Sequence, residues 1–228
     1  DAARRDQAPA VGRHESVQFL FYREWQAVRA EAARRGIRIL GDIPFYVSLD
    51  SADAWSRQEL FELDAAGRPL AVSGVPPDYF ARTGQLWGNP IYRWDRLEAD
   101  GFRWWIERIA ANLRQADLVR LDHFRGFVAY WRVPAGQETA ERGEWVECPG
   151  GAFFATVEEA LGELPLVAED LGLVTPEVEE LVDSLGLPGM RVLQWARLRA
   201  ARPPAPGRSS RPSTTWWRPS PPARAAPS

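Results

Sequence analysis

The chain has no lysine, a single cysteine and only two histidines among its 228 residues. One cysteine cannot form an internal disulfide, and no ligand cluster surrounds Cys148, so we interpret it as a structural thiol and not as a nucleophile. This cysteine usage is typical of a cytoplasmic protein. No apolar run approaches the roughly 20 residues that a membrane helix needs, so no membrane partner is expected.

The charged residues divide the chain into two parts. Up to Ala196 there are 21 arginines and 31 acidic residues, whereas residues 197–228 hold 7 arginines, eight prolines and no acidic residue. Such a proline-rich stretch forms neither a helix nor a central strand. Two interpretations stay open: a disordered basic linker, or a frameshift in GC-rich DNA, which the abrupt change after MRVLQWA favours. With no fold to position its charge, the tail is not expected to bind nucleic acid specifically.

Residues 1–196 alternate between helical and short apolar segments. Helical patterns cover residues 16–36, 101–115, about 157–163 and the stretch after Thr175, and they lead into the apolar segments IRILGDIPFYV, ADLVRLDHF, LPLVAED and GMRVLQWA. Four such repeats predict βαβ units and a parallel sheet. Two helices have clear apolar faces, made of Phe21, Trp25, Val28 and Ala32 in the first and of Phe102, Trp105, Ile106, Ile109 and Leu113 in the second. Thr156 and Glu159 form a capping box that predicts the start of the third.

A parallel sheet can stay open and doubly wound or close into a (β/α)₈ barrel. No glycine-rich phosphate loop follows any strand, which weakens the nucleotide-binding open sheet. Asp42, Asp122 and Glu169 all stand at strand ends, where the catalytic side chains of a barrel lie. We therefore predict an α/β fold in which residues 1–196 form a partial (β/α)₈ barrel of about four units.

The connection over residues 43–100 is too long for a plain loop and indicates a functional insertion. It carries Trp55 and then an aromatic run whose prolines and glycines argue against regular structure, with Tyr79, Phe80, Trp87, Tyr92 and Trp94. These aromatic side chains belong either to a small core beside the barrel or to a lid over a sugar cleft. The chain has 11 tryptophans, and flat apolar faces beside carboxylates are common in sugar-binding sites.

The end of the second strand combines a cation with a carboxylate. Residues two apart in a strand share a face, so Arg120 and Asp122 point the same way and His123 points the other way. The guanidinium keeps Asp122 ionised, whereas the apolar neighbours of Glu169 raise its pKa. One charged and one protonated carboxyl group, about 5 Å apart, perform the two roles in a retaining glycosidase. A structural Arg–Asp pair with an unrelated Glu is the alternative.

The segments GDIPFYV, GVPPDYF…GQLWGNPIYRW, VRLDHFRG and LVAEDLG, in this order, closely resemble the amylomaltases, the 4-α-glucanotransferases of glycoside hydrolase family 77. The resemblance covers about residues 10–196. It implies that Asp122 is the nucleophile, that Glu169 is the general acid/base and that Arg120 holds the nucleophile. The implied substrates are maltooligosaccharides and α-1,4-glucans, and no cofactor or metal is implied.

The resemblance also implies residues that bind substrate. Asp42 matches an invariant acid at the end of its strand. Four residues match a mobile loop that lines the acceptor side of the cleft: Asp78, Tyr79, Phe80 and Trp87. His123 belongs to the motif and, since it faces away from Asp122, we expect it to brace this loop.

The chain also departs from the family pattern. The family has a third catalytic carboxylate in a Thr-His-Asp-Asn-like block, yet no acidic residue follows Asp183 here. The segment with the first barrel strands and a substrate-binding tyrosine is missing too, and DAARRDQAPAVGR has no initiator methionine, as if cut from a longer sequence. Two further hypotheses stay open: an α-amylase-like hydrolase, and a non-catalytic α-glucan-binding remnant.

We predict that these 228 residues alone are inactive, because half a barrel leaves open sheet edges and the third carboxylate is absent. Incubation with maltotriose and chromatography of the products tests this. Formation of longer maltooligosaccharides would contradict the prediction.

Overall fold

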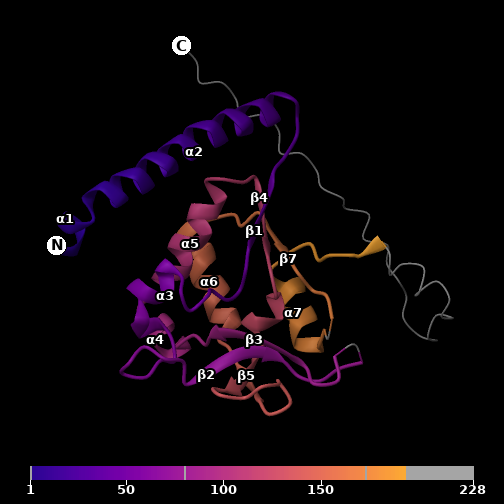
Figure 1. Ribbon diagram of the computed structural model, residues 1–228. Helices are drawn as coiled ribbons and strands as arrows, with labels where there is room; N and C mark the ends of the chain where they lie inside the picture. Colours follow the sequence, from indigo (N-terminus) through magenta and orange to yellow (C-terminus); the bar gives the residue numbers. More distant parts are fainter. Residues whose placement is uncertain (1, 80, 173, 194–228) are drawn as a thin grey trace. The chain divides into compact units, whose positions relative to one another are not determined.

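The computed structural model describes residues 2–79, 81–172 and 174–193 of the chain. They form an α/β fold with two sheets, one parallel and one antiparallel (Figure 1). By its contacts the chain divides into the units Asp1–Met190 and Arg191–Ser228, and all elements named below lie in the first. The tail predicted at 197–228 lies outside the described residues.

The parallel sheet consists of β1 (Leu40–Ile43), β4 (Leu118–Leu121) and β7 (Leu166–Ala168), in the order β1-β4-β7. These are three of the predicted strands. The prediction of a fourth strand in GMRVLQWA is wrong for its described part, because residues 189–193 form no strand. The preceding residue, Pro188, accepts one hydrogen bond from the backbone N–H of Ala168 at 2.9 Å, so this segment follows β7 without forming a ladder.

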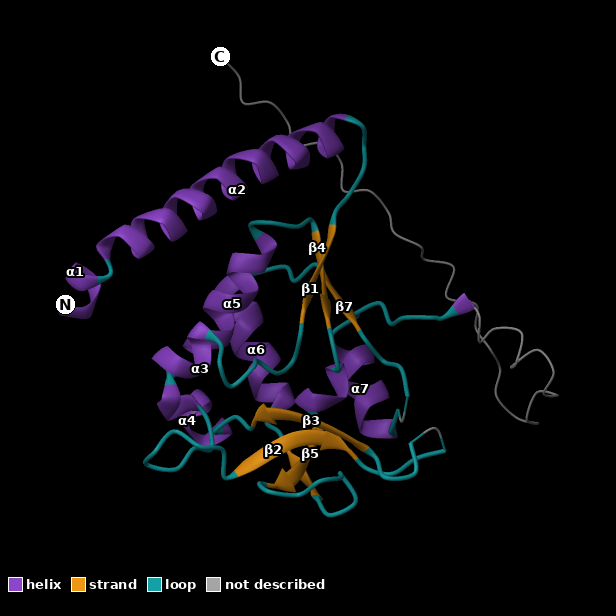
Figure 2. Ribbon diagram, in the orientation of Figure 1, coloured by secondary structure: helices purple, strands orange, loops and turns teal. Residues whose placement is uncertain are grey.

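Helices α5 (Arg103–Leu113) and α6 (Gly150–Leu161) pack together beside this sheet, and α7 (Pro176–Ser184) follows β7 (Figure 2). The apolar face predicted for α5 is confirmed, since Trp105 and Ile109 are fully buried. Helix α6 begins six residues before the predicted capping box. The Thr156 hydroxyl donates to the carbonyl of Ala152 inside the helix, because buried Phe153 and Phe154 draw the preceding turn into the helix.

An aromatic core joins the parallel sheet, the helices and the insertion. The ring of Phe127 lies 4.9 Å from those of Phe45 and Phe153, and T-shaped or offset pairs of this kind add to the stabilisation from burial. The Tyr92 hydroxyl donates to the carbonyl of Phe45 at 2.7 Å. Tyr92 and Trp94 are buried in this same cluster, so they belong to the core and not to a lid.

The antiparallel sheet has the order β3-β2-β5-β6 and is built from two connections. Strands β2 (Ala71–Val75) and β3 (Gln85–Pro90) come from the insertion, whereas β5 (Ala129–Pro134) and β6 (Glu144–Glu147) follow β4. The expectation that the insertion lacks regular structure is therefore wrong. Gly74 permits close pairing, since a Cβ there would collide with the Gln85 carbonyl, and glycine in a strand marks such an approach.

The remaining helices are short, apart from α2. They are α1 (Ala2–Asp6), α3 (Ala52–Ser56), α4 (Trp94–Ala99) and the 3-10 helices η1 (Gln58–Leu60) and η2 (Phe124–Phe127). Helix α2 (Ala8–Arg34) has no buried residue, so the apolar face predicted for it is not in the core. In the C-terminal half of α2, the Trp25 indole donates to the Gln115 carbonyl at 2.8 Å and Arg29 pairs with Asp117.

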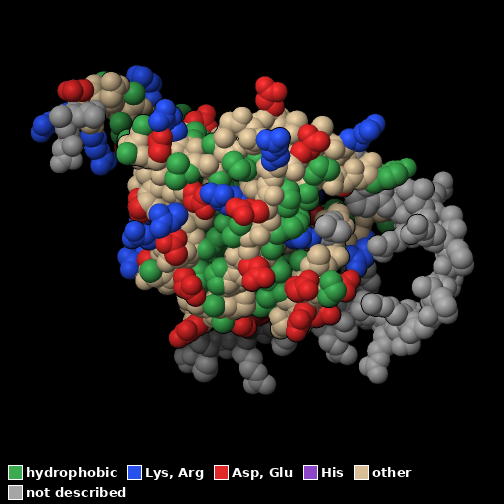
Figure 3. Space-filling view, turned by 90° about the horizontal axis from the view of Figure 1, so that it is seen from below, with side chains coloured by type: hydrophobic (Ala, Val, Ile, Leu, Met, Phe, Trp, Pro, Cys, Tyr) green, Lys and Arg blue, Asp and Glu red, His purple; other side chains and the backbone are tan. Residues whose placement is uncertain are grey.

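The face shown in Figure 3 carries acidic and arginine side chains interspersed with apolar ones, so charge of one sign does not gather there. Among the described residues, no helix combines the length and the apolar character that a membrane span requires.

Two adjacent glycines give a matched test of the α6 packing. A Cβ on Gly150 would collide with the backbone carbonyl of Phe127, whereas a Cβ on Gly151 meets nothing within 4 Å. We expect Gly150→Ala to lower the free energy of unfolding by about 1–3 kcal/mol through overpacking. Gly151→Ala should be neutral or stabilise by up to about 1 kcal/mol. Urea denaturation measures both, and equal effects would contradict the packing described here.

Candidate active site

The Arg120 guanidinium bridges two carboxylates at the ends of neighbouring strands. Its Nη1 lies 2.8 Å from Asp42 Oδ1 and its Nη2 lies 2.6 Å from Asp122 Oδ1. The Arg120 side chain is 21% exposed, whereas those of Asp42 and Asp122 are 61% and 42% exposed. The Arg120 side chain is thus the least exposed of the three, and both carboxylates keep a surface that a ligand can reach.

The strand register explains why these three side chains meet. Asp42 of β1 pairs with Arg120 of β4, so they leave the sheet at the same level. Asp122 follows β4 directly, two residues after Arg120 and on the same face, and its N–H donates to the Ile43 carbonyl at 2.9 Å. The backbone pairing of the sheet therefore places these three side chains side by side.

Glu169 joins the cluster from the end of β7. One carboxylate oxygen accepts the N–H of His123 at 3.0 Å, and the other accepts the N–H of Leu171 at 2.9 Å. Burial raises the pKa of Glu169, and the two backbone donors oppose this shift only partly. The raised pKa agrees with the expectation from its apolar neighbours. A group of this kind can hold a proton and deliver it to a leaving oxygen.

His123 lies between the carboxylates and the antiparallel sheet. Its backbone is left-handed, with φ of 52°, an uncommon conformation for a residue other than glycine. The ring stacks on Tyr46 and meets Trp87 of β3 edge-on at 4.8 Å between centroids. Burial lowers the pKa of His123 to about 4, with Asp122 opposing and Arg125 adding to the shift. The ring is therefore neutral near pH 7, and its buried Nε2 has no hydrogen-bond partner among the described residues.

The remaining predicted site residues lie on or near β3. Trp87 is 38% exposed and reaches the cluster through His123. Asp78 and Tyr79 lie in the turn between β2 and β3, where Asp78 accepts the N–H of Ala81 and Tyr79 is 95% exposed. Phe80 lies outside the described residues.

The sequence pattern did not indicate two residues that support the cluster. The Arg120 Nε donates to the Met190 sulfur at 3.1 Å, and the Asp170 carboxylate accepts the N–H of Met190 at 2.6 Å. Asp170 thereby fixes the segment that lies against Arg120. The only hint in the sequence was the pair of acids in AED. Consecutive residues of an extended chain point to opposite faces, so Asp170 needs a different partner from that of Glu169.

In the described part of the chain, no three His, Cys, Asp or Glu side chains converge as a metal site. The cluster combines a carboxylate beside a guanidinium with a second carboxyl group whose pKa is raised by burial. Two carboxyl groups in such different surroundings are characteristic of the class of enzymes that carry out retaining glycosyl transfer.

Comparisons with known proteins agree with this class. The family model of 4-alpha-glucanotransferase, glycoside hydrolase family 77, matches residues 1–214. The chain belongs to this family.

The relatives are similar at high identity but are longer. The chain is 56% identical over 189 residues to a 4-alpha-glucanotransferase of Thermus thermophilus and 51% identical over 183 residues to one of Aquifex aeolicus, covering 83% and 80% of this chain. It spans 38% of the length of each. An amylomaltase of Streptococcus agalactiae, solved in complex with acarbose, superposes with a TM-score of 0.82 at 43% identity, over 84% of this chain and 39% of that one.

The two histidines allow a controlled pH experiment. The pKa of His123 falls from 6.5 to about 4 on folding, so its contribution to stability is complete above pH 6.5 and is lost as the pH falls toward 4. We expect the wild type to lose about 3 kcal/mol more than His123→Asn over this range. Asparagine suits the left-handed backbone. The control His14→Asn, at an exposed position of α2, should follow the wild type in urea denaturation from pH 7 to 4. Parallel profiles for all three proteins would contradict the buried neutral state of His123.

Proposed function

We propose that the chain carries the nucleophile and the general acid/base of a 4-α-glucanotransferase, on part of a (β/α)₈ barrel. The observation that carries this proposal is the junction of β4 and β7. There Arg120 holds Asp122 at 2.6 Å, and the N–H of the next residue, His123, holds Glu169 at 3.0 Å. The two carboxyl groups to which we assign different roles are thus both held by residues 120–123.

In the first step, the Asp122 carboxylate attacks the anomeric carbon of an α-1,4-linked glucosyl unit. The bond to the leaving 4-oxygen breaks, and Glu169 gives that oxygen its proton. Arg120 stabilises the negative charge of Asp122 through one carboxylate oxygen, while Asp42 fixes the other side of the guanidinium. The product is a covalent glycosyl ester on Asp122.

In the second step, the 4-hydroxyl of another glucan attacks the same carbon. Glu169, now ionised, takes the hydroxyl proton, and the ester bond to Asp122 breaks. A sugar acceptor succeeds over water where apolar surfaces hold it in place. Trp87, beside His123 at the edge of the cluster, supplies such a surface, and Asp78 and Tyr79 extend it along the β2–β3 turn. The ring of His123 supports Trp87 through their edge-on contact.

The substrates follow from this chemistry and from the relatives. The relatives are 4-alpha-glucanotransferases, and the Streptococcus agalactiae amylomaltase was solved in complex with acarbose. The same substrate class, maltooligosaccharides and α-1,4-glucans, is proposed for this chain. Its reaction redistributes chain length without net hydrolysis.

A chimera tests the proposal, because the relatives extend far beyond this chain. Residues 10–190 replace the matching segment of the Thermus thermophilus enzyme, and maltotriose disproportionation is measured by chromatography. We expect activity from the chimera. Asp122→Asn should lower kcat by about 10⁴-fold or more, and Glu169→Gln by about 10²–10⁴-fold.

Two further measurements separate chemistry from folding. Asp95→Asn, at an exposed position of α4, is the matched control and should keep full activity. A fluorinated α-glucosyl fluoride that reacts slowly should label the peptide that contains Asp122, and mass spectrometry identifies that peptide. Labelling of Glu169, or an active Asp122→Asn chimera, would overturn the assignment of roles.

A further inference from the structure

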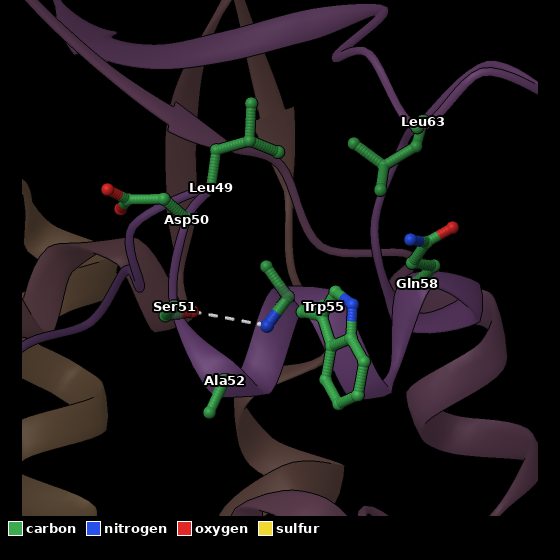
Figure 4. A pocket seen from close by; sticks show the side chains of 9 residues that line it. Leu49, Asp50, Ser51, Ala52, Trp55, Gln58 and Leu63 are labelled. Carbon is green, nitrogen blue, oxygen red and sulfur yellow. Dashed lines mark hydrogen bonds between the residues drawn. The ribbon is translucent and has the colours of Figure 1, made fainter. Parts of the chain in front are cut away.

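A hollow of about 380 Å³ lies in the connection between β1 and β2, on residues that take no part in the carboxylate cluster. Its walls come from the segment 49–55 and from Gln58, Leu63 and Gly67 (Figure 4). Ala54 forms its buried floor. A hollow of this size is within the roughly 300–1,000 Å³ of small-ligand sites.

Trp55 presents its indole at this hollow. Its side chain is 77% exposed, more than any other tryptophan in the described part of the chain, whereas Trp104 and Trp105 beneath α3 are buried. An exposed aromatic face beside a concavity offers a ligand a flat apolar surface on which to stack. Figure 4 shows the ring lying along the hollow, between Ala52 and Gln58.

The helix that carries Trp55 is held rigidly. The Ser51 hydroxyl accepts the N–H of Ala54 at 3.1 Å, and the Asp53 carboxylate accepts the indole N–H of Trp104 at 3.0 Å. Ala54 is 2% exposed, so α3 is anchored on its inner side. Trp55 is therefore exposed because its helix is fixed with this side outward, and it need not be reordered to receive a ligand.

Polar groups flank the indole on both sides. The Gln58 amide lies between the ring and Leu63, and it has no hydrogen-bond partner among the described residues (Figure 4). Asp50 lies at the opposite rim, where its carboxylate accepts the Ser48 hydroxyl. A pyranose ring has an apolar C–H face that can stack on an indole and hydroxyl groups around its edge that can bond an amide and a carboxylate. The hollow has this combination.

We propose that the Trp55 hollow is a second α-glucan site, in which the indole stacks on one glucosyl unit and Gln58 bonds its hydroxyl groups. The choice of glucan rests on the proposed function, because a polymer bound by the carboxylate cluster is long enough to be held at another point of the surface. The site holds the polymer near the enzyme and performs no chemistry.

Titration of the 228-residue chain with maltoheptaose, followed by calorimetry, tests this directly. We expect Trp55→Ala to weaken binding about tenfold and Gln58→Ala to weaken it several-fold, with Trp55→Phe close to wild type. Phe19→Ala is the matched control, because Phe19 is 65% exposed and lies on α2. It should bind as the wild type does. Thermal denaturation monitored by circular dichroism confirms that each variant is folded.

Two results overturn the site: no measurable binding by the wild type, or binding that survives Trp55→Ala and is lost in Trp87→Ala, which would place the glucan at the carboxylate cluster. The chimera separates this proposal from the proposed function. There Trp55→Ala should raise KM for amylose about tenfold and leave kcat/KM for maltotriose unchanged. If the chimera is active but glucan binding does not depend on Trp55, only the proposed glucan site at the hollow is rejected. An inactive chimera, with Trp55-dependent binding by the chain, rejects the catalytic role alone.

Discussion

The bridge from Arg120 to Asp42 and Asp122 is the interaction on which the arrangement of the site depends. A guanidinium at the end of a largely apolar strand needs charged partners, because an unpaired cation there would be costly. The two carboxylates supply them from neighbouring strand ends, and the Met190 sulfur faces the remaining Nε. One residue thereby ties β1, β4 and the segment after β7 into a single site, and the orientation of Asp122 is set by the same contacts that neutralise Arg120.

The scaffold around this bridge separates two tasks. The short parallel strands fix the position of the backbone at their ends. For example, the Glu169 N–H donates to the Leu121 carbonyl at 3.1 Å. The aromatic core behind them, from Phe45 to Phe153, supplies the burial that holds the strands and helices together. The residues of the candidate site stand at the strand ends, where side chains can be changed at little cost to the core.

The sequence predicted those parts of the site that depend on local order along a strand. Arg120 and Asp122 could be placed on one face because strands have a period of two, and Glu169 could be placed at a strand end because LPLVAED is apolar before its acids. The contact of Asp170 with Met190 could not be predicted, because it joins residues 20 positions apart in an irregular segment.

Glycine and helical periodicity were less reliable guides. Gly74 and Gly88 suggested an irregular insertion, although Gly74 is there to let strands pair closely. The apolar face of α2 suggested a buried helix, and periodicity alone does not say what covers a face. Both predictions failed because each depends on which distant segment packs against the residues concerned.

The antiparallel sheet has a consequence for how this architecture can vary. Its central strand β2 pairs with β3 from its own connection and with β5 from another, so two insertions about 60 residues apart are one folding element. Neither can be exchanged alone, because the other would be left with an unpaired strand edge. Trp87 stands on the first insertion and Trp145 on the second. The two insertions must therefore be inherited, or transplanted, together, even though β4 of the parallel sheet lies between them in the chain.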